Sequence, residues 1–280
     1  MRNLKTPAEN TWCPGCGNFG ILSAVRKAVA RLEDEGVTAS RLAISAGIGC
    51  HAKIFDYLAL SGFYSIHGRE MATVQGMKLA NPDLSVIAFA GDGDAYGEGL
   101  VHLLFAAKRN ADITVVVHDN GVYGLTTGQF TPTSPEGFKG PSTPGGNVER
   151  PFNPLALMLE AGATFVARGY PGSLDHLADL IVRAVRHRGC SFIDVLQPCV
   201  TYNDTYDRYN EHAGLMDDTP ATLDEALARA RQEDPLLLGV FRDEDKPTFH
   251  EKLMPDRNPV RDRLDRASRI RRMTTLYNNR

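Results

Sequence analysis

Oxygen-bearing side chains follow two consecutive apolar segments of the chain. Asp92 lies in a Gly-Asp-Gly-Asp turn after the apolar segment 84–91, and Asn120 follows the apolar segment 113–119. The stretch has the pattern strand, turn, helix, strand, so both residues should lie at the carboxyl ends of neighbouring strands, where open α/β sheets bind ligands. A carboxylate and an amide oxygen placed side by side suit a hard cation such as Mg2+.

The glycines of the same turn indicate what such a cation would accompany. Gly91 and Gly93 have no side chains, so a diphosphate can approach the backbone there. The helix predicted from about Glu98 would point its positive end at that diphosphate. The alternative is an acidic turn followed by an unrelated asparagine.

Four of the five cysteines stand in predicted loops at the ends of elements. Cys13 and Cys16 form a Cys-Pro-Gly-Cys pair, Cys50 ends a Gly-Ile-Gly-Cys turn, and Cys199 follows another strand. Four thiolates suit either Zn2+ or an iron–sulfur cluster. Cys190 begins an apolar stretch and is expected to be an inert buried thiol.

The composition is that of an ordinary globular protein. The chain has 280 residues, 42% of them hydrophobic, and a net charge of −3. No apolar run reaches the roughly 18 residues of a membrane span, and the N-terminus lacks a signal pattern, so we expect a cytoplasmic protein without membrane contact. The scattered cysteines do not form a secreted disulfide framework. The charge totals give no basic surface for nucleic acid.

The alternation of predicted strands and helices indicates an α/β fold, with a mostly parallel sheet and helices on both faces. Strands are expected at 42–47, 63–66, 84–91, 113–119, 164–168 and, as a final central strand, 191–197; helices are expected at 20–35, 70–80, from about 98, 155–161, 174–188 and, as a last helix, 222–232. The aperiodic segment 126–153 is long for a loop and is predicted to be a lid or a partner contact. The tail 256–280 carries eight arginines and is either a solvated extension or an arm on a partner subunit.

Two resemblances follow from these motifs. Gly-Asp-Gly followed about 26 residues later by Asn120 resembles the thiamine diphosphate-binding motif of thiamine-dependent enzymes. In order along the chain, W-C-P-G-C-G, G-I-G-C, H-G-R, G-D-G-D with a later D-N, Y-G-L-T-T-G-Q and Q-P-C-x-T-Y-N resemble the beta subunit of the 2-oxoacid:ferredoxin oxidoreductases. This resemblance covers about residues 10–210.

The resemblance implies a thiamine diphosphate-binding fold with three cofactors. Residues 1–220 would form the diphosphate-type domain with an N-terminal loop of iron–sulfur ligands, and 221–280 a C-terminal helix and an extended basic tail. Mg2+ would be held by Asp92, Asn120 and the backbone carbonyl of Val122, and a 4Fe-4S cluster by Cys13, Cys16, Cys50 and Cys199. A redox centre has a chemical purpose near thiamine, which favours the cluster over zinc. Cofactor contacts are expected from Gly47, Ile48, Gly49, Cys50, His67, Gly68, Gly91, Asp92, Gly93, Asp94, Asn120, Val122, Gly124, Leu125 and Thr126.

The implied reaction is the coenzyme A-dependent oxidative decarboxylation of a 2-oxoacid to acyl-CoA and CO2, reversible as reductive carboxylation. Electrons would pass through the cluster to ferredoxin, and the cofactors supply most of the chemistry. In the family the activating glutamate lies in a pyrimidine-binding domain of the alpha subunit, so the chain should be active only with that partner, as a dimer of alpha–beta heterodimers. The alternatives are a pyruvate-specific or broad enzyme, a non-redox thiamine-dependent decarboxylase subunit, and a non-catalytic electron-transfer subunit.

Several further residues have both a functional and a structural interpretation. Lys53, three residues after Cys50, is either a surface lysine or the partner of the far carboxylate of 2-oxoglutarate, in a pocket that Leu125 would help to shape. His67 would bind the diphosphate or transfer a proton, or else be structural. Arg69 would neutralise phosphate or pair with an acid such as Glu70. The hydroxyls of Thr126 and Thr127 are weaker candidates for the diphosphate region.

Overall fold

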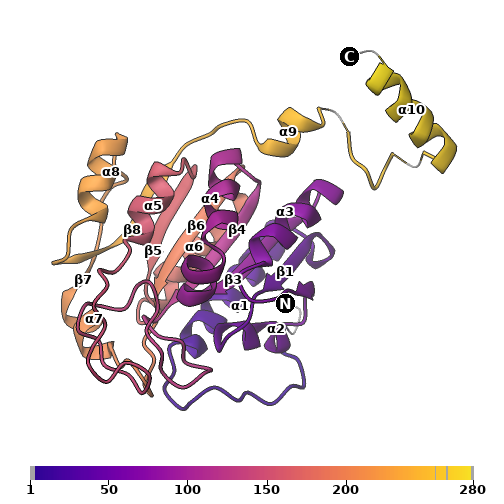
Figure 1. Cartoon of the computed structure of the whole chain (residues 1–280). Coiled ribbons are helices and arrows are strands. Elements are labelled where there is room, and N and C mark those ends of the chain that lie inside the picture. Colours follow the sequence, from indigo (N-terminus) through magenta and orange to yellow (C-terminus); the bar gives the residue numbers. More distant parts are fainter. Residues whose placement is uncertain (1–3, 256, 263, 279–280) are drawn as a thin grey trace.

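The computed structural model describes residues 4–255, 257–262 and 264–278. Its centre is a single eight-stranded sheet with the order β2-β1-β3-β4-β6-β5-β8-β7 (Figure 1). The strands are β1 (Leu42–Ala46), β2 (Ser61–Tyr64), β3 (Ser85–Gly91), β4 (Ile113–Asp119), β5 (Phe165–Gly169), β6 (Cys190–Leu196), β7 (Ala213–Leu215) and β8 (Leu236–Asp243). Neighbouring strands are parallel except for the antiparallel pair β5 and β8.

Helices cover both faces of the sheet. They are α1 (Asn18–Asp34), α2 (Ile54–Tyr57), α3 (Glu70–Ala80), α4 (Leu100–Arg109), α5 (Pro154–Glu160), α6 (Leu174–Arg186), α7 (Tyr206–His212), α8 (Leu223–Ala230), α9 (Phe249–Leu253) and α10 (Arg266–Asn278), with short helical turns η1 (Ala39–Arg41), η2 (His51–Lys53) and η3 (Gly93–Glu98). One apolar core joins the sheet to α1, α2 and α6, and a second core joins it to α3, α4, α5 and α8. The fold is therefore a three-layer α/β structure, as the sequence predicted.

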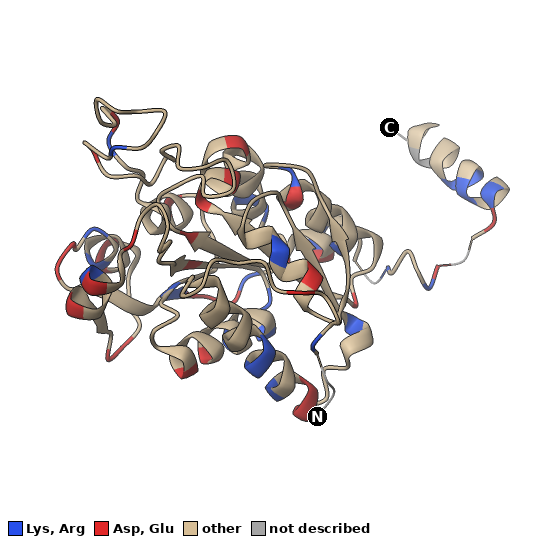
Figure 2. Cartoon of the chain, turned by 90° about the horizontal axis from the view of Figure 1, so that it is seen from below, with Lys and Arg blue, Asp and Glu red and all other residues tan. Residues whose placement is uncertain are grey.

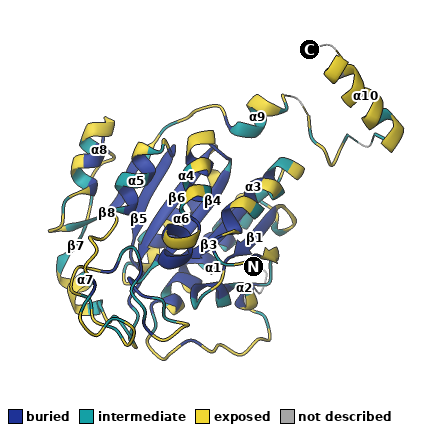
Figure 3. Cartoon of the chain, in the orientation of Figure 1, coloured by how far each residue is buried: buried dark blue, intermediate teal, exposed yellow. Residues whose placement is uncertain are grey.

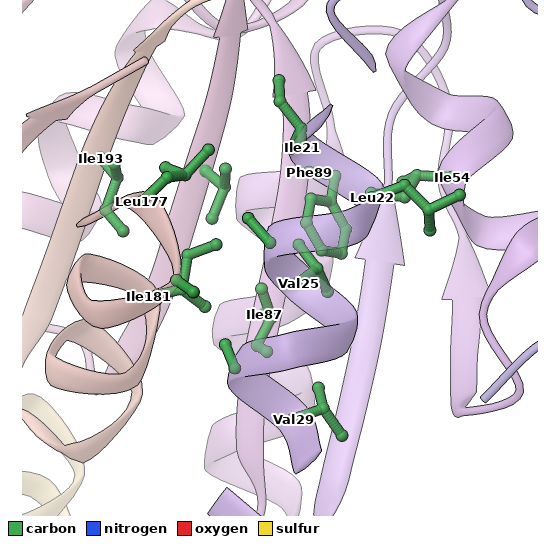
Figure 4. Packing of buried hydrophobic residues seen from close by; sticks show 14 of the residues in the cluster. Ile21, Leu22, Val25, Val29, Ile54, Ile87, Phe89, Leu177, Ile181 and Ile193 are labelled. Atoms are coloured by element: carbon green, nitrogen blue, oxygen red, sulfur yellow. The ribbon is translucent and has the colours of Figure 1, made fainter. Parts of the chain in front are cut away.

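The core beneath α1 and α6 shows why these segments form where they do. Apolar residues recur along α1 at helical spacing, including Ile21, Val25 and Val29, and all three are fully buried. Figure 4 shows them beside Leu177 and Ile181 of α6 and above the sheet residues Ile87, Phe89 and Ile193. The central strands β1, β3, β4, β5 and β6 are buried along most of their length, whereas the edge strand β2 is exposed. Other exposed residues gather on the outer sides of the helices (Figure 3).

The C-terminal third differs from the sequence-based expectation. The strand at 190–196 is not the final one, because β7 and β8 follow it, and 222–232 is not the last helix, because α9 and α10 follow. Strand β8 pairs antiparallel with β5, so it breaks the strand–helix alternation on which the prediction depended. The sheet thus continues beyond residue 220, and a boundary between a cofactor domain and a C-terminal extension stays a prediction.

The basic tail contains a helix. Helix α10 stands apart from the three layers, and its first turns carry arginines (Figures 1 and 2). Residues 256, 263, 279 and 280 of the predicted tail lie outside the described part of the chain. Across the described ranges, no helix has the length and apolar character needed to cross a membrane.

Candidate active site

The carboxyl ends of β3 and β4 bring the two predicted side-chain ligands of magnesium together. The strands are adjacent and parallel, with Gly91 opposite His118, so Asp92 and Asn120 follow at the same edge of the sheet. Both residues and Val122 line one open hollow of about 460 Å³. This is the arrangement that the strand, turn, helix, strand pattern predicted, with one correction. The helix starts at Leu100 rather than about Glu98, because the π-helical turn η3 intervenes.

Most predicted cofactor contacts line this first hollow. They are Ile48, Gly49, Cys50, His67, Gly91, Asp92, Gly93, Asp94, Asn120, Val122, Gly124, Leu125 and Thr126. Two lining residues, His51 and Tyr123, were not predicted. Gly47 and Gly68 lie just behind the hollow, where they contact Asp94.

Asp92 is buried and held by the long loop 126–153. The hydroxyls of Thr131 and Thr133 both donate to its Oδ2, the latter at 2.8 Å. Thr133 Oγ1 is also 2.7 Å from Oδ1 of Asp119. Burial raises the pKa of Asp92 and these hydroxyl bonds oppose the shift. Hydrogen bonds from this part of the loop therefore hold the carboxylate of Asp92 in place.

Asn120 is fixed by three neighbours. Its Oδ1 accepts from the backbone N–H of Val122 at 3.0 Å, and its Nδ2 donates to Gln197 Oε1 at 2.7 Å. Nδ2 of Asn203 donates to the backbone carbonyl of Asn120 at 2.7 Å. One carboxylate, one amide oxygen and one backbone carbonyl at this edge form an oxygen donor set that fits Mg2+.

Two glycines of the acidic turn lie in close contact with other side chains. A Cβ on Gly93 would collide with the ring of Tyr123, and one on Gly91 would lie 2.8 Å from Nδ1 of His51. Glycine is thus required by close packing at both positions, which line the hollow as a glycine cradle. The cradle fits a diphosphate beside the oxygen donors.

The four predicted cluster cysteines line a second hollow of about 450 Å³. Cys50, Asn120 and Gly124 line both hollows, so the two are contiguous. A Cβ on Gly124 would lie 3.5 Å from Sγ of Cys50 and 3.8 Å from Sγ of Cys199. All five cysteines are free thiols, and Cys190 is buried elsewhere in the core.

Loop contacts bring the cysteines together. The N–H of Gly17 donates to Pro198 O at 3.1 Å, which joins the N-terminal loop to the segment after β6. Trp12 Nε1 donates to Cys50 O at 2.6 Å. Burial raises the pKa of Cys16 to about 11, and the nearby thiols of Cys199, Cys50 and Cys13 act in the same direction. A metal that binds here must displace thiol protons.

The donor atoms of the cysteine hollow suit an iron–sulfur cluster or Zn2+. Within the part of the chain that the structure describes, no group of three or more His, Cys, Asp or Glu side chains has the geometry to hold one ion.

The predicted substrate residues lie on different hollows. Lys53 lines the cysteine hollow, with Nζ 3.4 Å from Thr11 O, while Leu125 lines the hollow of the acidic turn. Arg69 donates to the backbone carbonyls of Gly68 and Glu98. Thr126 donates to Gln129, and Thr127 does not line either hollow.

Three site residues escaped the sequence analysis. His51 directly follows Cys50, so its place in the sequence could have indicated that it lies in the site. Tyr123 lies within the quoted Y-G-L-T-T-G-Q motif. Glu70 looked like an ordinary first-turn helix acid, yet it is fully buried behind the acidic turn.

Comparisons with known proteins agree with this geometry. Residues 47–195 match the family model described as the thiamine pyrophosphate enzyme, C-terminal TPP binding domain, and residues 199–256 match the model of the C-terminal part of the pyruvate ferredoxin oxidoreductase beta subunit. The chain is 41% identical over 268 residues to the 2-oxoacid:ferredoxin oxidoreductase subunit beta of Saccharolobus solfataricus, covering 89% of this chain and 87% of the relative. The chain belongs to the beta subunits of the 2-oxoacid:ferredoxin oxidoreductases.

Two other relatives of this beta subunit have more specific names. It is 37% identical to the 2-oxoglutarate synthase subunit KorB of Archaeoglobus fulgidus, over 89% of this chain and 91% of the relative. It superposes with a TM-score of 0.89 and 34% identity on a 2-oxoglutarate:ferredoxin oxidoreductase from Magnetococcus marinus, covering 96% of this chain and 94% of that one. The predicted family, fold and oxidoreductase class are confirmed, and a beta subunit implies an alpha partner.

Proposed function

We propose that this beta subunit holds thiamine diphosphate, Mg2+ and a 4Fe-4S cluster, and that with its alpha subunit it oxidatively decarboxylates 2-oxoglutarate. The observation that carries the proposal is the contiguity of the two hollows through Cys50, Asn120 and Gly124. One hollow has the oxygen donors and glycine cradle of a diphosphate site, and the other has four thiols. Thiamine diphosphate supplies a nucleophilic carbon for decarboxylation, and an adjacent cluster accepts the electrons.

The chain's own residues bind and orient these groups. Asp92, Asn120 and the carbonyl of Val122 would hold Mg2+, with Thr131 and Thr133 fixing the carboxylate of Asp92. His67, whose side chain is 35% exposed, faces the same hollow and is placed to hydrogen-bond the diphosphate or move a proton. Cys13, Cys16, Cys50 and Cys199 would ligate the cluster.

The proposed substrate follows from the positive charge of Lys53. Lys53 lies beside Cys50 and lines the cysteine hollow, which adjoins the first hollow, and its ammonium would pair with the far carboxylate of a dicarboxylic 2-oxoacid. The Archaeoglobus and Magnetococcus relatives have 2-oxoglutarate in their names. A pyruvate-specific or broad 2-oxoacid enzyme is the second candidate, because the Saccharolobus relative is named only for 2-oxoacids.

The remaining participants belong to the whole enzyme. Coenzyme A would take the acyl group, ferredoxin would take the electrons, and an alpha subunit would supply the pyrimidine-binding domain in a dimer of alpha–beta heterodimers. The solved Magnetococcus relative was obtained with coenzyme A bound. With a sufficiently reducing ferredoxin the reaction would run as reductive carboxylation.

The decisive experiment is an anaerobic assay of the chain co-purified with its alpha subunit. Coenzyme A-dependent reduction of ferredoxin or a viologen is followed with 2-oxoglutarate and with pyruvate, and iron and thiamine diphosphate are measured on the same sample. The proposal predicts about four iron atoms per beta chain, as a 4Fe-4S cluster requires, and turnover that is fastest with 2-oxoglutarate. Bound thiamine diphosphate without iron or dye reduction would instead indicate a non-redox thiamine enzyme.

The role of Lys53 has its own test in the same assay. Lys53→Ile should lower kcat/KM for 2-oxoglutarate by about tenfold or more, because a charge-assisted hydrogen bond is lost, while pyruvate turnover is retained. Lys252→Ile, at an exposed lysine of α9 that lines neither hollow, is the matched control and should change neither substrate. Equal losses for both substrates with Lys53→Ile would exclude selective recognition.

A further inference from the structure

Two buried acids meet behind the first hollow. Glu70 begins α3 and is 0% exposed, and Asp94 lies in the π-helical turn η3 and is 2% exposed. Their carboxyl groups face each other across Gly47. A Cβ on Gly47 would collide with Oδ2 of Asp94 and lie 2.7 Å from Oε2 of Glu70. Only glycine therefore fits at position 47.

Most oxygens of these two carboxyl groups receive no hydrogen bond. Oδ1 of Asp94 accepts from the N–H of Gly68 at 2.5 Å. Among the described residues, Oδ2 of Asp94 and both carboxyl oxygens of Glu70 are buried without a hydrogen-bond partner. Unsatisfied buried acceptors are costly, and two ionised carboxylates in contact would also repel each other. One proton on Glu70 removes the repulsion and turns one of its oxygens into a donor toward Oδ2 of Asp94, so only the other Glu70 oxygen is left without a partner.

The surroundings of Glu70 favour the protonated form. Burial, followed by the charge of Asp94, raises the pKa of Glu70 to about 9. The backbone N–H at the start of α3 and the positive charge of Arg69 act in the opposite direction and are outweighed. The proton therefore stays on Glu70 at neutral pH.

Asp94 in turn contacts two histidines of the hollow. Its Oδ2 is 3.2 Å from Nε2 of His51, and its Oδ1 is 3.4 Å from Nδ1 of His67. With Nε2 of His51 turned toward Asp94, Nδ1 faces the glycine turns, because a Cβ on Gly49 or Gly91 would lie 2.8 Å from it. Both contacts are ion-pair distances without hydrogen-bond geometry, since Nε2 of His51 and Nδ1 of His67 are buried without a hydrogen-bond partner. The Asp94 carboxylate thus lies next to both imidazole rings.

We propose that Glu70 is a positioning residue that donates a hydrogen bond to Asp94 and so fixes the carboxylate that lies next to His51 and His67 at the hollow. Both acids belong to this chain and are buried within it. The proposal rests on the proposed function only where it takes the hollow to hold thiamine diphosphate. Two experiments separate these parts.

The first experiment follows the Tm of the full chain without ligands from about pH 5 to about pH 9. The pKa of folded Glu70, about 9, lies above its ordinary value of 4.5. Stabilisation by the protonated acid is therefore complete below the ordinary value and is lost as the pH rises toward 9. Glu70→Gln keeps a donor and has no proton to lose, so its Tm should exceed that of the wild type by a margin that grows with pH.

Parallel pH curves for the wild type and Glu70→Gln would overturn the shared proton. Glu70→Met has a similar size but no donor, so its Tm should lie below that of Glu70→Gln at every pH. Glu160→Met, at an exposed acid at the end of α5, is the matched control and should follow the wild-type curve.

The second experiment measures binding of thiamine diphosphate with Mg2+ to the alpha–beta complex. Glu70→Gln should bind within about twofold of the wild type, and Glu70→Met about tenfold more weakly, because only the former retains the hydrogen bond to Asp94. Equal binding by all three proteins would overturn the positioning role. A wild-type complex that does not bind would refute the proposed function instead, while the pH experiment still decides the state of Glu70.

Discussion

A single hydroxyl links two acids of the site at the residue scale. Thr133 Oγ1 lies 2.8 Å from Asp92 and 2.7 Å from Asp119, and it has only one proton to donate. Burial, then the charges of Asp194 and Asp92, raises the pKa of Asp119 well above its usual range. The single hydroxyl proton of Thr133 can serve only one of these acids at a time, so the threonine links Asp92 and Asp119.

This arrangement predicts a specific loss in Thr133→Val. The variant keeps the shape of the side chain but removes one hydrogen bond from Asp92, which retains that of Thr131, and one from Asp119, so the free energy of unfolding should fall by about 1–3 kcal/mol. Thr133→Ser restores the hydroxyl and should recover most of the loss. Denaturant unfolding of the full chain measures both variants, and an unchanged midpoint in Thr133→Val would show that the hydroxyl contributes little.

The cysteines give a second prediction at this scale. Cys16 lines the cysteine hollow, whereas Cys190 is buried in the opposite core. Cys16→Ala should lower the iron content of anaerobically purified alpha–beta complex to less than about half, because a cluster needs its thiolate ligands. Cys190→Ala is the matched control and should retain iron. Similar iron in both variants would contradict the assignment of Cys16.

At the scale of elements, apolar periodicity and turn residues predicted the helices and strands that depend on local sequence. Helix α3 was predicted at its observed bounds, and the edge formed by β3 and β4 was predicted from the apolar runs and the residues that follow them. Strand β8 was missed because a short apolar run does not by itself distinguish a strand from a helix. Its partner β5 lies far away in the sequence and pairs with it antiparallel. Glu70 and Asp94 were likewise unpredictable as a pair, because only the folded sheet brings α3 and η3 together over Gly47.

The placement of β8 in the main sheet has a measurable consequence. Phe241 on β8 is fully buried in the core that also contains Phe192 of β6. Phe241→Ala should reduce the free energy of unfolding by about 3–5 kcal/mol through lost burial and a cavity. Leu253→Ala in α9, where the side chain is 56% exposed, should change it by less than about 0.5 kcal/mol. Equal small effects would place β8 outside the cooperative core.

At the scale of the whole molecule, the chain would present one half of the proposed cofactor site. The apolar side chains of Ile48 and Leu125, 38% and 49% exposed, line the same hollow as Asp92 and Asn120. Apolar exposure beside polar ligand groups indicates a surface that a second component covers. An alpha subunit that supplies the pyrimidine-binding half would cover it and exclude water from the bound cofactor.

This half-site predicts that thiamine diphosphate stabilises the complex more than the isolated chain. A ligand that binds only the folded state contributes about 2.7 kcal/mol at a hundredfold excess over its Kd. With Mg2+ and thiamine diphosphate, the Tm of the alpha–beta complex should therefore rise by several degrees. The isolated chain should shift much less, because it contacts only the diphosphate. Thiamine without the diphosphate should leave the isolated chain unchanged, since the glycine cradle and the magnesium ligands then have no partner. An equal rise for the chain and the complex would mean that this subunit holds the whole cofactor by itself.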